Sequence, residues 1–268
     1  MEYDKKSNLR NWFLKFNANT DFAVAVSGGV DSLTLGTYVN RLFFGKIKIF
    51  HSVTPSVPPQ ATDRVTKIAR EEKWDLQIIN PNEFEDDNYL KNPLNRCFYC
   101  KTNLYETIAR CTTKQIISGT NLDDLSEFRP GLSAAEKLKV KHPFVEVSYK
   151  KIDVRELARD LGLGEISELP ASPCLSSRIE TGIGIDARIL KLVNETEILV
   201  DKLIKPKTVR CRVRGDGIHI ELDQDSFIGL TEKRRIDLKL KIKLLFGATG
   251  LKFDIKFDPY RVGSAFVS

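Results

Sequence analysis

The sequence predicts an α/β fold, in which a parallel sheet carries helices on both faces, followed by a smaller C-terminal α+β domain. Up to about residue 181, short apolar runs alternate with segments of helical apolar spacing, the pattern of βαβ units with right-handed crossovers. Beyond that residue the order changes to a helix, two strands around a tight turn, a helix and a strand. We therefore expect two domains in the 268 residues, 1–181 and 182–268.

The first domain opens with the apolar run 21–26, DFAVAV, which predicts a buried strand feeding a tight turn. Further strands are expected at 46–53, 76–79 and 115–121, and helices at 32–44, 61–74, 97–111 and 153–163. Asp153 is the expected N-cap of the last helix, and the polar stretch 80–95 is expected to be a surface loop. Ligands gather at the carboxyl ends of parallel strands, where we expect the loops 27–32, 119–124 and 170–174.

The second domain is predicted from a helical segment at 186–203 and two strands, 208–215 and 217–223, that meet at the turn RGDG. A further helix and a strand at 251–257 follow. Residues two apart in a strand share a face. We therefore expect Arg210, Arg212 and Arg214 on one face of the first strand. The opposite face, toward the core, should carry Val209, Cys211 and Val213. Such a face suits phosphate or carboxylate. The alternative is a solvated basic face, paired with acids of the neighbouring helix.

Composition narrows the class of protein. A net charge of +6 and a pI near 9.0 favour anionic partners, such as nucleotides, phosphorylated small molecules or RNA. No apolar run approaches the roughly 18 residues of a membrane span, and the N-terminus lacks the apolar core of a signal peptide. Five cysteines at irregular spacing indicate thiol or metal chemistry more than disulfides. We expect a cytoplasmic protein with no membrane contact.

The stretch AVSGGVDS, residues 25–32, predicts an anion site. A strand, a Ser-Gly-Gly turn and a helix N-terminus let backbone N–H groups approach a phosphate, and the helix dipole adds partial positive charge. The expected binding residues are Ser27, Gly28, Gly29, Asp31 and Ser32. Asp31 fits beside phosphate only if Mg²⁺ bridges the two. No Gly-Lys-Ser/Thr follows, so ordinary γ-phosphate transfer is not indicated. The alternative is a plain strand-to-helix turn.

The cysteines leave several kinds of site open. Cys97 and Cys100 form a C-x-x-C, which suits a redox dithiol, half a zinc site, part of an iron–sulfur site or two incidental thiols. Cys174 lies in the loop 170–174, expected at the same edge of the sheet, and could join them. Cys111 and Cys211 are expected to be small buried residues.

The motif SGGxDS resembles the PP-loop ATP pyrophosphatases, which cleave ATP between the α- and β-phosphates and adenylate an oxygen of their substrate. The segment GTNLDDLSEFRPG, residues 119–131, resembles a family segment near the nucleotide. The resemblance implies ATP and Mg²⁺ as cofactors, with Asp124, or Asp123 as a second choice, serving Mg²⁺. Arg129 would meet phosphate or order the loop. A turn and a helix cap remain the other interpretation of the two acids.

The whole chain resembles the LarE family of ATP-dependent sulfur transferases. The resemblance runs in order through SGGVDS, EFRPGLSA, PASPCLSSRIETG, TVRCRVRGDGIHIEL and DPYRVGS. It implies adenylation of a carboxylate on a pyridinium mononucleotide, then replacement of the activated oxygen by sulfur. The product would be a thiocarboxylate for the nickel-pincer cofactor of lactate racemase. It also implies a homo-oligomer.

Two sulfur strategies occur in that family. Some members sacrifice one cysteine of the PAS…SSR loop, and others hold a [4Fe-4S] cluster on three cysteines, with an extra sulfide on the fourth iron. Cys97, Cys100 and Cys174 resemble the second type, which draws on sulfide or another sulfur donor; a sacrificial Cys174 is the alternative. The resemblance also implies substrate-binding roles for Arg210, Arg212 and Arg261. It makes Arg178, beside Cys174, a further candidate, and we expect Cys174, Asp31 and Arg178 to be the catalytic residues. Glu197 lies near the substrate or on an exposed helix face.

Three rival functions stay open. A tRNA thiolase would share the ATP chemistry and the cluster, but we find no arginine/lysine run with interleaved aromatics, so nucleic acid is not the expected partner. A synthetase that uses ammonia would not need the three cysteines. A nucleotide-binding or iron–sulfur scaffold would bind ATP without releasing pyrophosphate.

Overall fold

The computed structural model describes residues 5–16, 21–126, 130–171, 173–247, 254–261 and 263–264. The chain forms two compact units, one of residues 1–83 with 97–172 and one of residues 84–96 with 173–268. The short segment 84–96 thus joins the C-terminal part of the chain. The division into independently folding domains at residues 181 and 182 stays a prediction.

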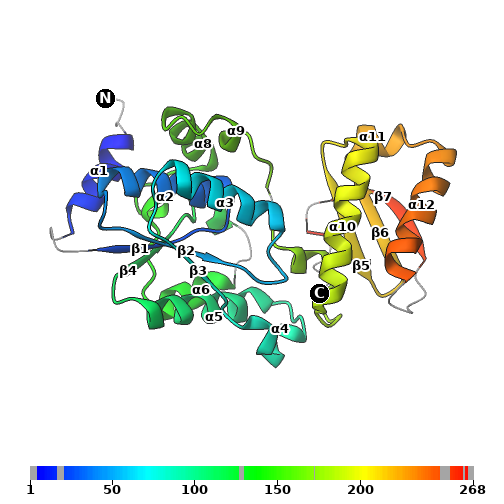
Figure 1. Cartoon of the computed structure of the whole chain (residues 1–268), viewed down its shortest axis with the longest axis horizontal. Helices are drawn as coiled ribbons and strands as arrows, with labels where there is room; N and C mark the ends of the chain where they lie inside the picture. The colour runs from blue at the N-terminus through cyan, green and yellow to red at the C-terminus, as the bar shows by residue number, and fades with distance from the viewer. Residues whose placement is uncertain are drawn as a thin grey trace. The chain divides into compact units, whose positions relative to one another are not determined.

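A parallel sheet of four strands forms the centre of the first unit. The strands lie in the order β3-β2-β1-β4 (Figure 1). All pairings are parallel, as predicted. Their bounds are β1 Phe22–Ala25, β2 Lys48–Ser52, β3 Leu76–Ile79 and β4 Gln115–Ser118. The strand that precedes the Ser-Gly-Gly turn is therefore an inner strand of the sheet.

Helices cover both faces of this sheet, because the strands alternate apolar side chains between two cores. Phe22 and Val24 pack into one core with α1, α2 and α8, whereas Ala23 packs into the other core with α5 and α6. The helices are α1 Lys5–Leu14, α2 Val30–Leu42, α3 Pro59–Glu71, α5 Arg96–Cys111, α6 Gly131–Lys137, α7 Pro143–Glu146, α8 Lys151–Asp160 and α9 Gly164–Ser167, with 3₁₀ turns η1 Glu83–Glu85 and η2 Leu122–Ser126. The predicted α/β class is confirmed.

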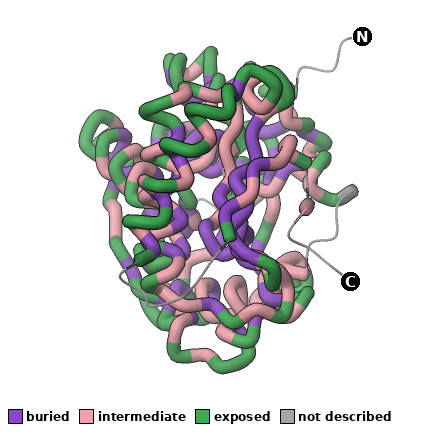
Figure 2. Tube along the Cα trace, turned by 90° about the vertical axis from the view of Figure 1, so that its right-hand side faces the viewer, coloured by how far each residue is buried: buried purple, intermediate pink, exposed green. Residues whose placement is uncertain are grey.

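The second unit contains a three-stranded mixed sheet. Strands β5 Val209–Arg214 and β6 Gly217–Leu222 form the predicted antiparallel hairpin, and β7 Ile255–Pro259 pairs with β6 in parallel. The long helix α10 Ala187–Ile204 packs against β5 and against α12 Glu232–Gly247. All six residues of β6 are buried, and Figure 2 shows such buried stretches in purple. Three shorter elements complete the unit: α4 Asp87–Leu90, η3 Leu175–Arg178 and α11 Gln224–Ile228.

Two local predictions are wrong. The stretch 80–95 is not a plain surface loop, because it contains η1 and α4 and buries Tyr89 and Asn92 to 1% exposure each. The two buried residues are isolated in an otherwise polar segment, so they form no periodic apolar pattern from which the burial could be predicted. Asp153 is not the N-cap of α8. The helix begins at Lys151, and the Asp153 carboxylate accepts the Lys150 backbone N–H at 2.8 Å. An acid in the first turn satisfies helix donors from either position.

Asn92 fastens the segment 84–96 to the rest of the second unit. Its backbone is left-handed, with φ 51°. Its side-chain amide donates hydrogen bonds to the carbonyls of Glu180 at 2.8 Å and Ile183 at 2.9 Å. One buried side-chain amide thus supplies the hydrogen bonds that join two segments distant in the sequence, in place of secondary structure.

We expect Asn92→Ala to lower the free energy of unfolding by about 2–3 kcal/mol, because the buried amide is lost and two partly buried carbonyls lose their donor. Asn82→Ala is the matched control, since Asn82 is also left-handed, with φ 58°, but is exposed. It reports the cost of the same substitution at an exposed left-handed position, which we expect to stay below about 1 kcal/mol. Urea unfolding followed by circular dichroism measures both values; equal losses in the two variants would contradict the anchoring role.

Candidate functional site

The loop 27–32 joins β1 to α2 with a geometry that requires glycine at one position. Gly28 has φ +86°, and a Cβ on it would lie 2.7 Å from the carbonyl oxygen of Ala61 on α3. Gly29 is the N-cap of α2, with φ −86°, and a Cβ there would meet nothing closer than the Ser27 hydroxyl at 3.7 Å. The strand, turn and helix N-terminus expected for an anion site are therefore present.

Ser32 fixes the shape of this loop from inside the first turn of α2. Its hydroxyl donates to the Gly29 carbonyl and accepts the Ser27 backbone N–H, both at 3.1 Å. The two serine hydroxyls are also 3.1 Å apart. The predicted residues Ser27 and Ser32 thus lie together, and their contacts hold the backbone between them.

A second glycine brings the segment after β4 against the same helix turn. A Cβ on Gly119 would lie 2.8 Å from the Asp31 carbonyl carbon and 2.9 Å from the Ser32 nitrogen, so only glycine allows this approach. The approach places Asn121, which is buried, where its amide donates to the Asp31 carboxylate at 3.2 Å. The other Asp31 oxygen forms an ion pair with Lys151 at the start of α8.

The two acids of the GTNLDD segment stabilise local backbone. Asp124 accepts the Asn121 N–H at 3.1 Å, and Asp123 accepts the Lys151 N–H at 2.8 Å. These contacts match the turn-and-cap interpretation, and the Mg²⁺ role of Asp124 stays a prediction. Across the described residues, no three thiol, imidazole or carboxylate side chains are grouped in a way that could hold a metal ion.

Two residues that the sequence did not predict flank the loop. His51 on β2 is buried, and burial lowers its pKa. The neutral ring donates from Nδ1 to the Val26 carbonyl at 2.8 Å and accepts the Thr62 hydroxyl at Nε2, 2.9 Å away. Arg64 of α3 donates from Nε to the Gly28 carbonyl at 3.0 Å. No sequence motif marks either residue, and the topology alone brings them to the loop.

The cysteines of the C-x-x-C lie near the start of α5. Cys97 and Cys100 are three residues apart in a helix and so share a face. Both are half-buried and belong to the first unit, whereas Cys174, also half-buried, precedes η3 in the second unit. The described residues include all five cysteines, and none of these forms a disulfide.

The remaining two cysteines differ in burial. Cys211 is buried as predicted, and burial strongly raises the pKa of its thiol, so it stays protonated and unreactive. The prediction that Cys111 is buried is wrong, because this residue ends α5 and is exposed. Helical spacing shows that a residue belongs to a helix, but not that the helix end is covered.

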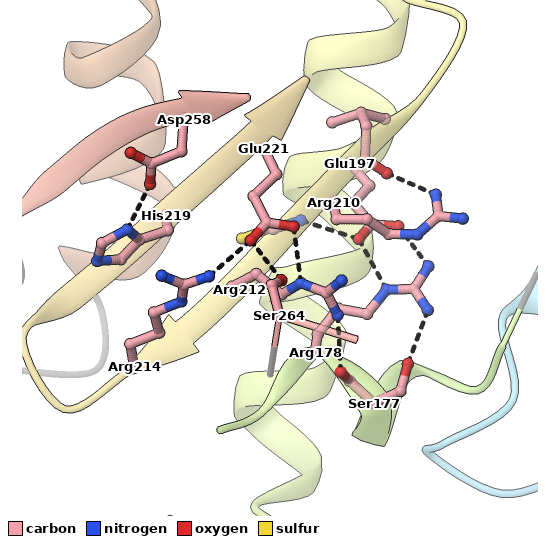
Figure 3. Close-up of polar contacts among 12 residues, drawn as sticks. Ser177, Arg178, Glu197, Arg210, Arg212, Arg214, His219, Glu221, Asp258 and Ser264 are labelled. Atoms are coloured by element: carbon pink, nitrogen blue, oxygen red, sulfur yellow. Dashed lines mark hydrogen bonds and ion pairs between the residues drawn. The ribbon is translucent and has the colours of Figure 1, made fainter. Parts of the chain in front are cut away.

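Arg178 holds the backbone around Cys174. Arg178 is 2% exposed, and its guanidinium forms a bidentate pair with Glu197 of α10, through Nε at 2.9 Å and Nη2 at 3.1 Å (Figure 3). Its Nη1 donates to the carbonyls of Pro173 at 2.7 Å and Cys174 at 3.2 Å. Burial alone would lower the pKa of Arg178, but the Glu197 carboxylate raises it, so the group stays charged.

The three arginines of β5 share one face, as predicted, but this face is not simply solvated. Arg212 is buried and pairs with the buried Glu221 of β6 at 3.0 Å, while Arg214 pairs with the other oxygen of that carboxylate at 2.6 Å. Arg212 also donates to the Ser177 carbonyl at 2.8 Å, and the Ser264 hydroxyl donates to Glu221 at 2.6 Å. The acid partner thus comes from the neighbouring strand, which the sequence analysis did not predict.

Arg210 completes what we call the arginine cluster, which consists of Arg178, Arg210, Arg212 and Arg214 with Glu197 and Glu221 (Figure 3). Arg210 is half-buried and its guanidinium lies 5.7 Å from the ring centroid of Tyr260. Burial lowers its pKa and the nearby Arg178 lowers it further. Four guanidinium groups against two carboxylates leave the cluster with a net positive charge, which suits an anion.

Two predicted site residues remain, Arg261 and Arg129. Arg261 is exposed, just beyond β7. Arg129 lies outside the described residues.

Comparison with known proteins places the chain among relatives of similar length. No protein-family model matches it. An uncharacterised protein of Synechocystis is 32% identical over 222 residues, which covers 81% of each chain. An uncharacterised protein of Methanocaldococcus jannaschii is 30% identical over 240 residues, 88% of this chain and 89% of the relative. A protein of Lactiplantibacillus plantarum, named pyridinium-3,5-bisthiocarboxylic acid mononucleotide synthase, is 27% identical over 206 residues, 75% of this chain and 74% of the relative.

The chain belongs to the LarE-like family. Within the described part of this LarE-like chain, no helix is both long enough and apolar enough to cross a membrane.

The two adjacent glycines of the loop should respond differently to the same substitution. We expect Gly28→Ala to lower the free energy of unfolding by about 2–4 kcal/mol, because the new Cβ meets the Ala61 backbone in a strained conformation. Gly29→Ala should cost only about 0.5–1 kcal/mol, the usual penalty for alanine at an N-cap. Chemical denaturation measures both, and an equal cost would contradict the role assigned to the contact with α3.

Proposed function

We propose that this LarE-like protein is an ATP-dependent sulfur transferase that converts a carboxylate of a pyridinium mononucleotide into a thiocarboxylate. The observation that supports the use of ATP is the loop 27–32. Hydrogen bonds of Ser32 hold this loop in shape, and so do close backbone contacts at Gly28 and Gly119 that only glycine permits. The printed name of the Lactiplantibacillus relative supports the substrate class. The net positive arginine cluster supports an anionic substrate.

The first half-reaction activates the carboxylate. An oxygen of the substrate carboxylate attacks the α-phosphorus of ATP, the bond to the β-phosphate oxygen breaks, and pyrophosphate leaves. Ser27, Gly28, Gly29 and Ser32 would bind the leaving pyrophosphate through backbone N–H and hydroxyl groups, together with Arg129. Asp31 and Asp124 would hold Mg²⁺, which usually takes only one or two protein carboxylates and completes its shell with phosphate and water.

The second unit would bind the substrate. Arg210, Arg212 and Arg261 are the residues we assign to its phosphate and carboxylate groups, since guanidinium binds both bidentately. The strong pairs of Arg178 with Glu197 and of Arg212 with Glu221 hold these side chains rigid before any ligand arrives. Arg178 also fixes the carbonyls that flank Cys174, so it positions the thiol.

The second half-reaction forms the carbon–sulfur bond. A hydrosulfide attacks the acyl carbon of the adenylate, the carbon–oxygen bond to AMP breaks, and AMP and a proton are released. We propose that Cys97, Cys100 and Cys174 hold a [4Fe-4S] cluster; three half-buried thiols outside disulfides are the donor set that such a cluster requires. When bound, the cluster supplies one iron without a protein ligand, at which a hydrosulfide can bind. Cys174 as a sacrificial sulfur is the second candidate.

Iron analysis separates the two sulfur strategies. We expect about four irons and four acid-labile sulfides per chain after anaerobic purification. Cys97→Ala should lose them, whereas Cys111→Ala should keep them, because Cys111 lies at the exposed end of the same helix. A wild-type protein without iron after anaerobic reconstitution would contradict the cluster. Loss of the mass of one H₂S from the chain after turnover would then identify Cys174 as the sulfur source.

Pyrophosphate release with nicotinic acid mononucleotide as the probe tests the adenylation. We expect release that depends on the probe and on Mg²⁺, and a loss of about 100-fold or more in Asp31→Asn. Lys151→Met is the control, because it removes the same ion pair but leaves the carboxylate for the metal. Its Mg²⁺ requirement should match that of the wild type. Release independent of Asp31 would contradict the assignment of the metal ligand.

A further inference from the structure

Helix α3 contributes an arginine to the loop 27–32. The first turn of α3 touches the loop, since Ala61 leaves no room for a side chain on Gly28. Three residues further along the helix, Arg64 donates from Nε to the Gly28 carbonyl at 3.0 Å. The guanidinium is therefore tied to the backbone of the loop at one nitrogen, Nε.

Arg64 is a cation in a half-buried position, and none of the described acids is bound to it. Within the described residues, no carboxylate forms a hydrogen bond or ion pair with it, and its one hydrogen bond there goes to a neutral carbonyl. Burial lowers the pKa of Arg64, and the charge of Asp63 offsets this only in part. An arginine stays protonated in any case, so among the described residues its charge is not neutralised by a bound carboxylate.

Arg41, on the neighbouring helix α2, is an arginine of the same unit whose donors bind a carboxylate of the protein. Its Nε and Nη2 both bind the Glu72 carboxylate, at 2.9 and 2.6 Å. The fork of donors on Arg41 is thus occupied by a carboxylate from the protein. Among the described residues, Arg64 donates through Nε alone, so its Nη N–H groups keep their capacity to bind a planar or tetrahedral anion.

We propose that Arg64 binds the pyrophosphate part of ATP at the loop 27–32. The assignment rests on the proposed function, because it requires that the loop binds these phosphates. Arg64 would contact the β- or γ-phosphate oxygens and add a charge-assisted hydrogen bond to the backbone contacts of the loop. It would serve the leaving group and leave the adenosine monophosphate part untouched.

Three variants test the role of this charge. Arg64→Gln removes the charge but keeps an N–H group that can donate to the Gly28 carbonyl, so the loop keeps its tether. Arg64→Lys keeps the charge without the fork. Arg70→Gln is the matched control, since Arg70 is an exposed arginine of the same helix. Calorimetric titration with Mg²⁺-pyrophosphate, Mg²⁺-ATP and AMP measures the affinities of the full chain.

We expect Arg64→Gln to weaken pyrophosphate and ATP binding about 10- to 100-fold, the size of one hydrogen bond to a charged group, and to leave AMP binding within about two-fold. Arg64→Lys should lose less, and Arg70→Gln should match the wild type. Wild-type affinity for pyrophosphate in Arg64→Gln would overturn the assignment, as would an equal loss for AMP. A wild-type chain that binds neither ATP nor pyrophosphate would instead overturn the proposed function, and this assignment with it.

Discussion

The close approach of three backbone segments at the start of α2 determines the geometry of the first unit. Gly28 admits the first turn of α3, and Gly119 admits the segment after β4 to within contact of Asp31 and Ser32. A side chain at either position would push these segments apart. Both contacts involve backbone atoms, and the contact of Gly119 lies against the backbone of Asp31 itself. Asn121, Lys151 and Arg64 then reach the loop from three different elements.

Buried charge plays the corresponding part in the second unit. Glu221 and Arg178 are almost fully buried, and each is matched by an opposite charge with good hydrogen-bond geometry. Loss of one partner from such a pair costs several kcal/mol, because the other charge is left desolvated. The pairs therefore fix the orientation of the arginines, and Arg178 extends this order to the carbonyl of Cys174.

The proposed reaction draws on residues of both units. The loop 27–32, Cys97 and Cys100 belong to the first unit, and Cys174 and the arginine cluster belong to the second. The segment 84–96 shows how closely the two units are interleaved in sequence, since it leaves the first unit after Glu83 and returns to it at Cys97. The α5 helix that carries the C-x-x-C thus begins where the chain re-enters the first unit.

The sequence by itself determined the features that depend on local chemistry. Alternating apolar runs predicted the four parallel strands and the hairpin of β5 and β6, and the Ser-Gly-Gly turn predicted the loop that joins β1 to α2. The period of two placed the three arginines of β5 on one face. These inferences succeed because strand alternation and glycine turns depend only on neighbouring residues.

Only the tertiary structure decided which distant groups meet. Glu221 pairs with Arg212 and Arg214, Lys151 pairs with Asp31, and Arg64 reaches Gly28, and none of these contacts follows from spacing along the chain. The burial of Asn92 in a polar stretch and the exposure of Cys111 at a helix end have the same cause. Whether a side chain is buried depends on how segments distant in the sequence pack against it. A local sequence pattern does not predict that packing.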